Sequence, residues 1–227
     1  EADAVAMTEA GPEIGVASTK AFTAQLAALA GLAGAAGAAR GMLDAEAASA
    51  LAGALLEAPR RVNEALAMEP EVEGVARTLM GANDVLYLGR GPFFPLALEG
   101  ALKLKEISYI HAEGYPGGEL KHGPIALIED GSPVVVAAPK DGLFAKMMSN
   151  VEEVIARGAR VILLTDPPGA REAGDLAATT LIIPETHPII QPMVAAVPIQ
   201  LLAYHTAALK GTDVDQPRNL AKSVTVE

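Results

Sequence analysis

The sequence predicts an α/β fold in which a parallel β-sheet is covered by helices on both faces. From residue 69 onward, short and continuously apolar runs alternate with segments of helical periodicity. Strands of that kind are typical of a parallel sheet that is buried on both sides. Hydrophobic residues make up 51% of the 227 residues, which is enough for one or two domains with a proper core.

The expected elements follow in order along the chain. Residues 3–9 alternate enough to form a short strand. Ser18 or Thr19 caps a first helix, which Gly41 ends, and Asp44 starts the second. In order, we expect a strand at 3–9, helices at 19–39, 44–66 and 70–80, a strand at 84–88, a helix at 93–109, a strand at 133–138, a helix at 142–157, strands at 160–165 and 181–184, and a helix ending near residue 210.

Composition excludes several functional classes. The formal net charge of −11 argues against a nucleic-acid partner, because phosphate backbones need clustered Lys and Arg. The chain has no cysteine, which excludes disulfides and cysteine-ligated zinc and fits a reducing cytoplasm. No apolar run reaches the length of a membrane span; residues 21–39 come closest, but glycines interrupt them. The chain starts with Glu1 and shows no signal-peptide pattern, so we expect part of a longer protein.

A glycine-rich junction at 88–95 follows the expected strand at 84–88. Folds of this class place their ligand crevice at such a junction. Gly89 and Gly91 let a backbone approach a bound molecule, and the following helix N-terminus favours an anion. The third glycine of a dinucleotide-binding motif is missing. The junction is therefore either a ligand crevice or a tight turn that packing requires.

The helix that begins there carries a charged stripe. At about 100° per residue, Glu99, Lys103 and Glu106 share one narrow face, and apolar residues flank that face on both sides. Burying an ionised group is costly unless it is paired or has a function. The stripe is either a site or an ordinary ladder of ion pairs between neighbouring turns, and the two can coexist.

Residues 111–124 contain two histidines and two carboxylates. Their spacing does not match a histidine pair on one helix, and the glycines between them would leave metal ligands unconstrained, so we expect no metal site. His122, which precedes Gly123 and Pro124 in a loop, is better suited to proton transfer near neutral pH.

The polar segment 211–227 follows a long apolar stretch. It carries Arg218 and Lys222, and Pro217 fixes part of its backbone. This pattern suits a segment that docks into a cleft and delivers a lysine there. The alternative is a frayed chain end, which is the usual state of termini.

Together these side chains suit sugar isomerisation. Moving a carbonyl between C1 and C2 requires a group that opens the sugar ring and a base that carries a proton from one carbon to the next. A lysine that forms a Schiff base with the ketone makes that proton more acidic. Glu106, His122 and Lys222 fit the roles of base, ring opener and Schiff-base lysine, and Lys103 steadies the developing charge.

Four segments carry a resemblance to a known family: residues 15–22, 97–113, 118–124 and 213–227. They resemble the isomerase half of the glucosamine-6-phosphate synthases, which are glutamine–fructose-6-phosphate aminotransferases of amino-sugar synthesis. The resemblance runs in order along nearly the whole chain. It implies sugar-isomerase (SIS) subdomains, each a flavodoxin-like three-layer unit with a five-stranded parallel sheet. On that basis residues 1–68 are the remnant of a first subdomain, 69–210 are a second, and 211–227 are a tail that closes the site.

The resemblance also implies roles for individual residues. Glu106 matches the base, and His122 matches a ring-opening histidine that reaches the neighbouring site of a homodimer. Lys222 matches the Schiff-base lysine. Lys103 and Arg218 match supporting positions, and the positions that line the sugar are Val16 and Ala221. The implied ligands are fructose 6-phosphate and glucosamine 6-phosphate, with no metal or organic cofactor, in the cytoplasm.

The chain also departs from this family. The glutaminase domain is missing, and so is most of the first SIS subdomain with its Ser/Thr-rich phosphate loop. We therefore expect the 227-residue chain alone to be inactive. Two alternatives stay open: a related deglycase or single-function sugar-phosphate isomerase, and a sugar-phosphate-sensing regulatory module that performs no chemistry.

Overall fold

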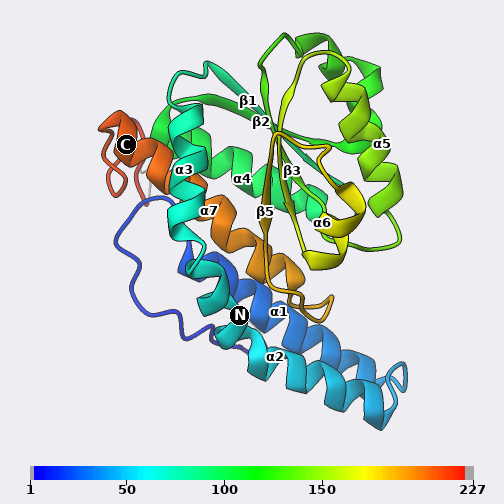
Figure 1. Cartoon of the computed structure of the whole chain (residues 1–227). Coiled ribbons are helices and arrows are strands. Elements are labelled where there is room, and N and C mark those ends of the chain that lie inside the picture. Colours follow the sequence, from blue (N-terminus) through cyan, green and yellow to red (C-terminus); the bar gives the residue numbers. More distant parts are fainter. Residues whose placement is uncertain (1–2, 223–227) are drawn as a thin grey trace.

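A five-stranded parallel sheet organises residues 3–222, the part of the chain that the computed structural model describes (Figure 1). The strand order is β2-β1-β3-β4-β5, and each neighbouring pair is parallel. The bounds are β1 (Asp84–Gly89), β2 (His111–Pro116), β3 (Pro133–Ala137), β4 (Arg160–Thr165) and β5 (Thr179–Ile182). After β1 the chain adds β2 on one side of it and then returns to add β3 on its other side, so the order in which strands are added changes direction between β1 and β3. The predicted α/β fold with a parallel sheet is confirmed.

Helices cover both faces of the sheet because alternate residues of each strand point in opposite directions. On β1, Val85 and Tyr87 pack under one helical layer, whereas Leu86 and Leu88 pack under the other. The first layer contains α3 (Glu69–Leu79), α4 (Phe93–Ser108) and α7 (Gln191–Lys210), and the second contains α5 (Phe144–Ile155) and the short helix η1 (Gly117–His122). The result is three layers with a separate apolar core on each side of the sheet.

A helical hairpin precedes the sheet domain and projects from it (Figure 1). It consists of α1 (Lys20–Ala39) and α2 (Ala45–Leu66), as predicted. Asp44 is the N-cap of α2, and its carboxylate accepts a hydrogen bond of 2.8 Å from the Ala47 N–H. The hairpin packs on the start of α7 through Ala30, Ala54 and Ala58. Leu29 and Leu32 of α1 stay exposed, so α1 has an apolar face that no described residue covers.

The structure corrects the prediction for residues 3–9, which form no strand. A strand needs a neighbour for its backbone hydrogen bonds, and the sheet lies in another part of the chain. Conversely, β2 and α6 (Pro167–Ala173) were not predicted, nor were η1 and η2 (Pro124–Leu127). The edge strand β2 contains His111, Glu113 and Pro116, a composition typical of a loop, and an edge position tolerates proline.

Among residues 3–222, two helices, α1 and α7, are long and apolar enough to cross a membrane by length and composition alone. The expectation that no apolar stretch reaches that length is therefore wrong for both. Of the α7 window, 61% is buried inside the described structure, as the core helix of a folded domain would be.

Candidate active site

The charged stripe of α4 forms a compact ion-pair network. The Lys103 ammonium lies 2.8 Å from Oε2 of Glu106 and 3.6 Å from Oε1 of Glu99. These distances follow from the helix, because residues three and four apart share one face. Lys103 is buried, and both glutamates are partly buried. The network is thus an internal feature of the fold.

The two flanks of this stripe differ, which corrects the expectation of apolar cover on both sides. Phe93, Leu104 and Ile107 are buried in the core between α4 and the sheet. Leu98 and Leu102 on the other flank are exposed, at 45% and 40%. The stripe therefore lies at the border between the core and the surface.

Glu99 is the less well paired of the two glutamates in the network. Its Oε1 is buried and accepts no hydrogen bond from a described residue. Burial raises the pKa of Glu99 above the usual value; Lys103 opposes this shift, and the negative charge of Glu106 adds to it. Two carboxylates share one ammonium, so neither charge is fully balanced.

The junction before α4 is a tight turn rather than a ligand crevice. A side chain on Gly89 would meet the Phe93 carbonyl oxygen at 2.0 Å, and Gly91 has a φ of +56°. The space beside the junction has a volume of about 10 Å³, because side chains including Leu143 and Phe144 fill it. A single water needs about that much room. Of the two interpretations of this motif, packing is the one that the geometry supports.

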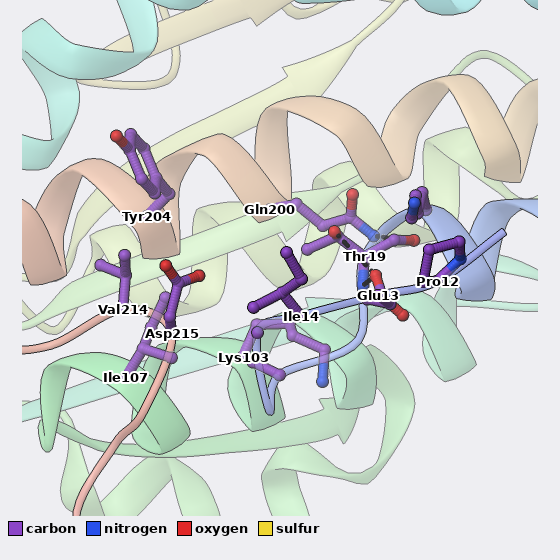
Figure 2. Close-up of a pocket in the computed structure, with 13 residues that line it drawn as sticks. Pro12, Glu13, Ile14, Thr19, Lys103, Ile107, Gln200, Tyr204, Val214 and Asp215 are labelled. Carbon is purple, nitrogen blue, oxygen red and sulfur yellow. Dashed lines mark hydrogen bonds between the residues drawn. The ribbon is translucent and has the colours of Figure 1, made fainter. Parts of the chain in front are cut away.

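A cavity of about 390 Å³ opens where four segments meet (Figure 2). Its walls come from residues 12–20, from α4, from α7 and from the C-terminal tail. Helix α4 contributes Lys103 and Ile107, and α7 contributes Gln200 and Tyr204. This size lies within the range of small-molecule sites. Lys103 thus joins the ion-pair network to the cavity.

The tail forms part of this wall because hydrogen bonds from backbone and side-chain groups hold it there. The Val16 N–H donates to the Asp215 carbonyl oxygen at 2.9 Å. Gly15 permits this approach, since a side chain there would meet Oδ1 of Asp215 at 3.1 Å. The Thr212 hydroxyl donates to the Ile107 carbonyl oxygen at 2.6 Å. The N-terminal segment and the tail, from opposite ends of the chain, therefore lie side by side.

Two basic residues of the tail make specific contacts. The Arg218 guanidinium stacks over the Tyr109 ring at 4.2 Å, and its backbone N–H donates to the Tyr109 hydroxyl at 2.9 Å. The Lys222 ammonium lies 3.8 Å from Oε2 of Glu13 in the cavity wall. The tail therefore docks on the domain as far as Lys222. Residues 223–227, the end of the expected tail, lie outside the described residues.

The structure does not bring every predicted site residue to the cavity. Lys103 lies in the cavity wall, and Val16 lies beside the wall, where it binds Asp215. Glu106 is linked to the cavity through its ion pair with Lys103. Ala221 is exposed in the tail next to Lys222. His122 is exposed at the end of η1 and is not among the cavity residues, so a role for it within this single chain has no support. The roles of these residues stay predictions.

Sequence reasoning missed Glu13, Gln200 and Tyr204. Glu13 lies in an irregular segment, and the two α7 residues look like ordinary members of an apolar helix. No local spacing marks any of the three. Among residues 3–222, no group of three or more His, Asp or Glu side chains is arranged to hold a metal ion.

Comparison with solved structures shows close similarity of fold. The C-terminal domain of glucosamine-fructose-6-phosphate aminotransferase from Francisella tularensis is 44% identical, with a TM-score of 0.89, over 92% of this chain and 59% of that one. A putative phosphosugar isomerase from Silicibacter pomeroyi is 27% identical, with a TM-score of 0.71, over 92% of this chain and 58% of that one.

Curated relatives are similar over the whole chain. The glutamine–fructose-6-phosphate aminotransferases (isomerizing) of Zymomonas mobilis and Brucella abortus are 60% and 61% identical over 227 residues. The chain spans 37% of the length of each of these relatives. It therefore corresponds to the isomerase part of such proteins.

The SIS domain model matches residues 78–210, which contain the sheet, α4 and α7. This match covers more than half of the chain, and the parallel sheet agrees with it. The chain belongs to the SIS domain family.

Proposed function

We propose that this chain is the isomerase part of an enzyme that makes glucosamine 6-phosphate from fructose 6-phosphate and glutamine. The observation that carries the proposal is the identity of 60% over all 227 residues to relatives named for that activity. Their name favours this function over a deglycase or a sugar-sensing module. The Lys103–Glu106 pair beside a cavity supports it, because the reaction needs a positioned base.

Each proposed catalytic residue acts at a different step of the conversion of fructose 6-phosphate. His122 transfers a proton at the ring oxygen so that fructose 6-phosphate opens. Lys222 condenses with the C2 ketone, and water leaves as the imine forms. Ammonia then attacks C2 and displaces the lysine amine, so that C2 carries the nitrogen of the product and the C1 protons stay acidified by the imine. Glu106 takes a proton from C1 and returns it to C2, while Lys103, 2.8 Å from its carboxylate, balances the negative charge that develops.

The proposed assembly is a cytoplasmic homodimer. His122 is exposed and lies outside the cavity wall, which fits a residue that completes the site of a neighbouring subunit. Leu29 and Leu32 leave an apolar surface on α1 that suits contact with further protein. A glutaminase domain, outside this chain, supplies ammonia from glutamine.

The test uses the full-length product of the gene that encodes this chain. It should convert fructose 6-phosphate and glutamine to glucosamine 6-phosphate, and Glu106→Gln should reduce turnover by about 1,000-fold, as expected for loss of a general base. Glu71→Gln, an exposed change on α3, is the matched control. A wild-type protein that binds fructose 6-phosphate but forms no glucosamine 6-phosphate contradicts the proposal.

A second test concerns this chain by itself. We expect it to bind fructose 6-phosphate weakly and to show no useful turnover, because residues 139–144 offer no hydroxyl cluster and the adjacent space is filled. A phosphate dianion without fixed donors gains little over water. Calorimetry beside the longer two-subdomain isomerase half tests this. Equal affinities would mean that the chain carries its own phosphate site.

A further inference from the structure

Glu13 and Asp215 are acidic residues in the cavity wall that the proposed mechanism does not use, and Glu13 is the one that contacts Lys222. It lies beside Thr19 in the wall (Figure 2), and 11% of its side chain is exposed. Its Oε1 accepts hydrogen bonds from the Thr19 N–H at 2.7 Å and from the Thr19 hydroxyl at 3.1 Å. Its Oε2 accepts from the Ser18 hydroxyl at 3.1 Å. Both carboxylate oxygens are therefore fixed by neighbours on its own segment.

This carboxylate is held in its charged form. Burial raises the pKa of Glu13, but hydrogen bonds from Thr19 and Ser18 and the charge of Lys222 outweigh that effect, so the pKa lies below its usual value. Glu13 is thus an anion at neutral pH.

Oε2 of Glu13 also has a partner outside its own segment. Closing the 13–19 loop onto the start of α1 needs an acceptor for the Thr19 N–H, which Oε1 provides. Oε2, which also accepts from the Ser18 hydroxyl, lies in addition 3.8 Å from the ammonium of Lys222, which reaches it from the other end of the chain. Loop closure alone does not explain this contact. A fixed anion in the cavity wall does explain how a lysine of the tail, which is not itself among the cavity residues, stays next to that wall.

We propose that Glu13 is a positioning residue for Lys222, which holds the lysine at the cavity and balances its charge. This inference rests on the proposed function, because it assumes that Lys222 condenses with the ketone of the sugar. The carboxylate stays in place through its contacts to Ser18 and Thr19, so it offers the tail a fixed docking point.

The charge balance of the condensation supports this role. The Lys222 ammonium first gives a proton to water or a nearby base, and the free amine attacks the C2 carbonyl carbon. A proton moves from nitrogen to the former carbonyl oxygen, which gives a carbinolamine. The hydroxyl takes up the proton that the ammonium first released and leaves as water, while the nitrogen lone pair forms the C=N bond of the iminium. The nitrogen therefore carries one positive charge both before and after the reaction, and Glu13 is placed to balance it in both states.

The experiment traps the iminium. Full-length wild-type protein and variants are mixed with fructose 6-phosphate and sodium borohydride, which reduces an iminium to a stable secondary amine, and mass spectrometry measures the adduct on the peptide that contains Lys222. Glu13→Gln keeps the shape but removes the charge. Glu13→Asp keeps the charge on a shorter side chain. Glu64→Gln, which removes a carboxylate that pairs with Arg60 and Arg61 on α2, is the matched control.

We expect Glu13→Gln to slow adduct formation and turnover by about tenfold with KM nearly unchanged, because the reacting amine is less well placed. Glu13→Asp should fall between Glu13→Gln and wild type, and Glu64→Gln should match wild type. Thermal unfolding of each variant separates a folding defect from a positioning defect, and the Asp variant decides if the Gln variant does not fold.

Two other outcomes are distinct. Equal trapping in wild type and Glu13→Gln overturns the role of Glu13 and leaves the proposed function intact. Absence of any adduct on Lys222 in the active wild type contradicts the Schiff-base role of Lys222, and the positioning role of Glu13 fails with it.

Discussion

Helix α4 and the C-terminal tail each bring a lysine to the candidate site, but they hold it in opposite ways. Lys103 is 4% exposed, lies in the middle of a helix and has carboxylates on two neighbouring turns. The Lys222 side chain is 45% exposed, belongs to a segment without regular structure and lies 3.8 Å from Glu13. One lysine is part of the core, and the other is placed against it.

This difference matches the two kinds of work that we assign. A group that stabilises charge acts best when it is fixed in advance in a dry setting, as Lys103 is. A group that forms a bond with the substrate must reach it, change geometry and leave, which an exposed lysine on a tail can do. The comparison therefore predicts that the two lysines respond differently to mutation: a change at Lys103 lowers stability as well as turnover, whereas a change at Lys222 lowers turnover alone.

Lys222→Ala tests the tail most strongly. In the full-length protein it should reduce turnover by about 1,000-fold or more, because the covalent step has no other amine in place. The melting temperature should stay unchanged, since the side chain is largely exposed. Steady-state kinetics and thermal unfolding measure both.

The matched control for that experiment is Lys210→Ala, which removes an exposed lysine from the end of α7. It should leave turnover unchanged. Retained turnover in Lys222→Ala would break the comparison, because the tail lysine would then be no reactant.

Lys103→Met tests the core lysine. It leaves Glu99 and Glu106 without their shared cation, and losing one partner of a buried ion pair costs about 3 kcal/mol or more of the free energy of unfolding. Urea denaturation measures this loss.

Lys105→Met, on the exposed face of the same helix, is the control and should change the free energy of unfolding by less than about 0.5 kcal/mol. If both substitutions cost equally little, Lys103 is a surface lysine in solution and the contrast with Lys222 disappears.

The sequence predicted the sheet domain well because its signals are local. The apolar runs at 133–138 and 160–165 became strands β3 and β4, and the helix from Phe93 was found with the right start. The strand expected at 3–9 did not form, and β2 was missed, because an isolated strand or a polar edge strand is decided by its neighbours rather than by its own residues.

The same division applies to the site. The pairing of Lys103 with Glu99 and Glu106 follows from helical spacing, so it was predictable. The contact between Glu13 and Lys222 joins nearly opposite ends of the chain and leaves no pattern in either segment. A position such as Lys222 was found through resemblance, whereas its partner required the folded structure.

Arg218→Ala tests how the tail is held on the domain. It removes the guanidinium stacked over Tyr109, a contact worth about 0.5–1 kcal/mol at an exposed site. We expect faster hydrogen exchange in residues 212–222 by a few-fold, with global stability unchanged, because the tail can open while the domain stays folded. Arg171→Ala on α6 is the control, and equal exchange in both variants would mean that the stack does not hold the tail.

Glu99→Gln gives the smallest expected effect and concerns pH. Because burial raises the pKa of Glu99 from 4.5, the folded state binds its proton more tightly than the unfolded state does. The stability that this protonation contributes is fully present below pH 4.5 and is lost as the pH rises through the raised pKa. Glutamine does not titrate, so the variant should gain on wild type between pH 4 and pH 7, by up to about 1 kcal/mol. Thermal unfolding of both proteins across that range measures the gain. A variant that is less stable than wild type over this range would mean that the attraction between Lys103 and Glu99 outweighs the effect of burial. Lys103 would then pair equally with both carboxylates rather than mainly with Glu106.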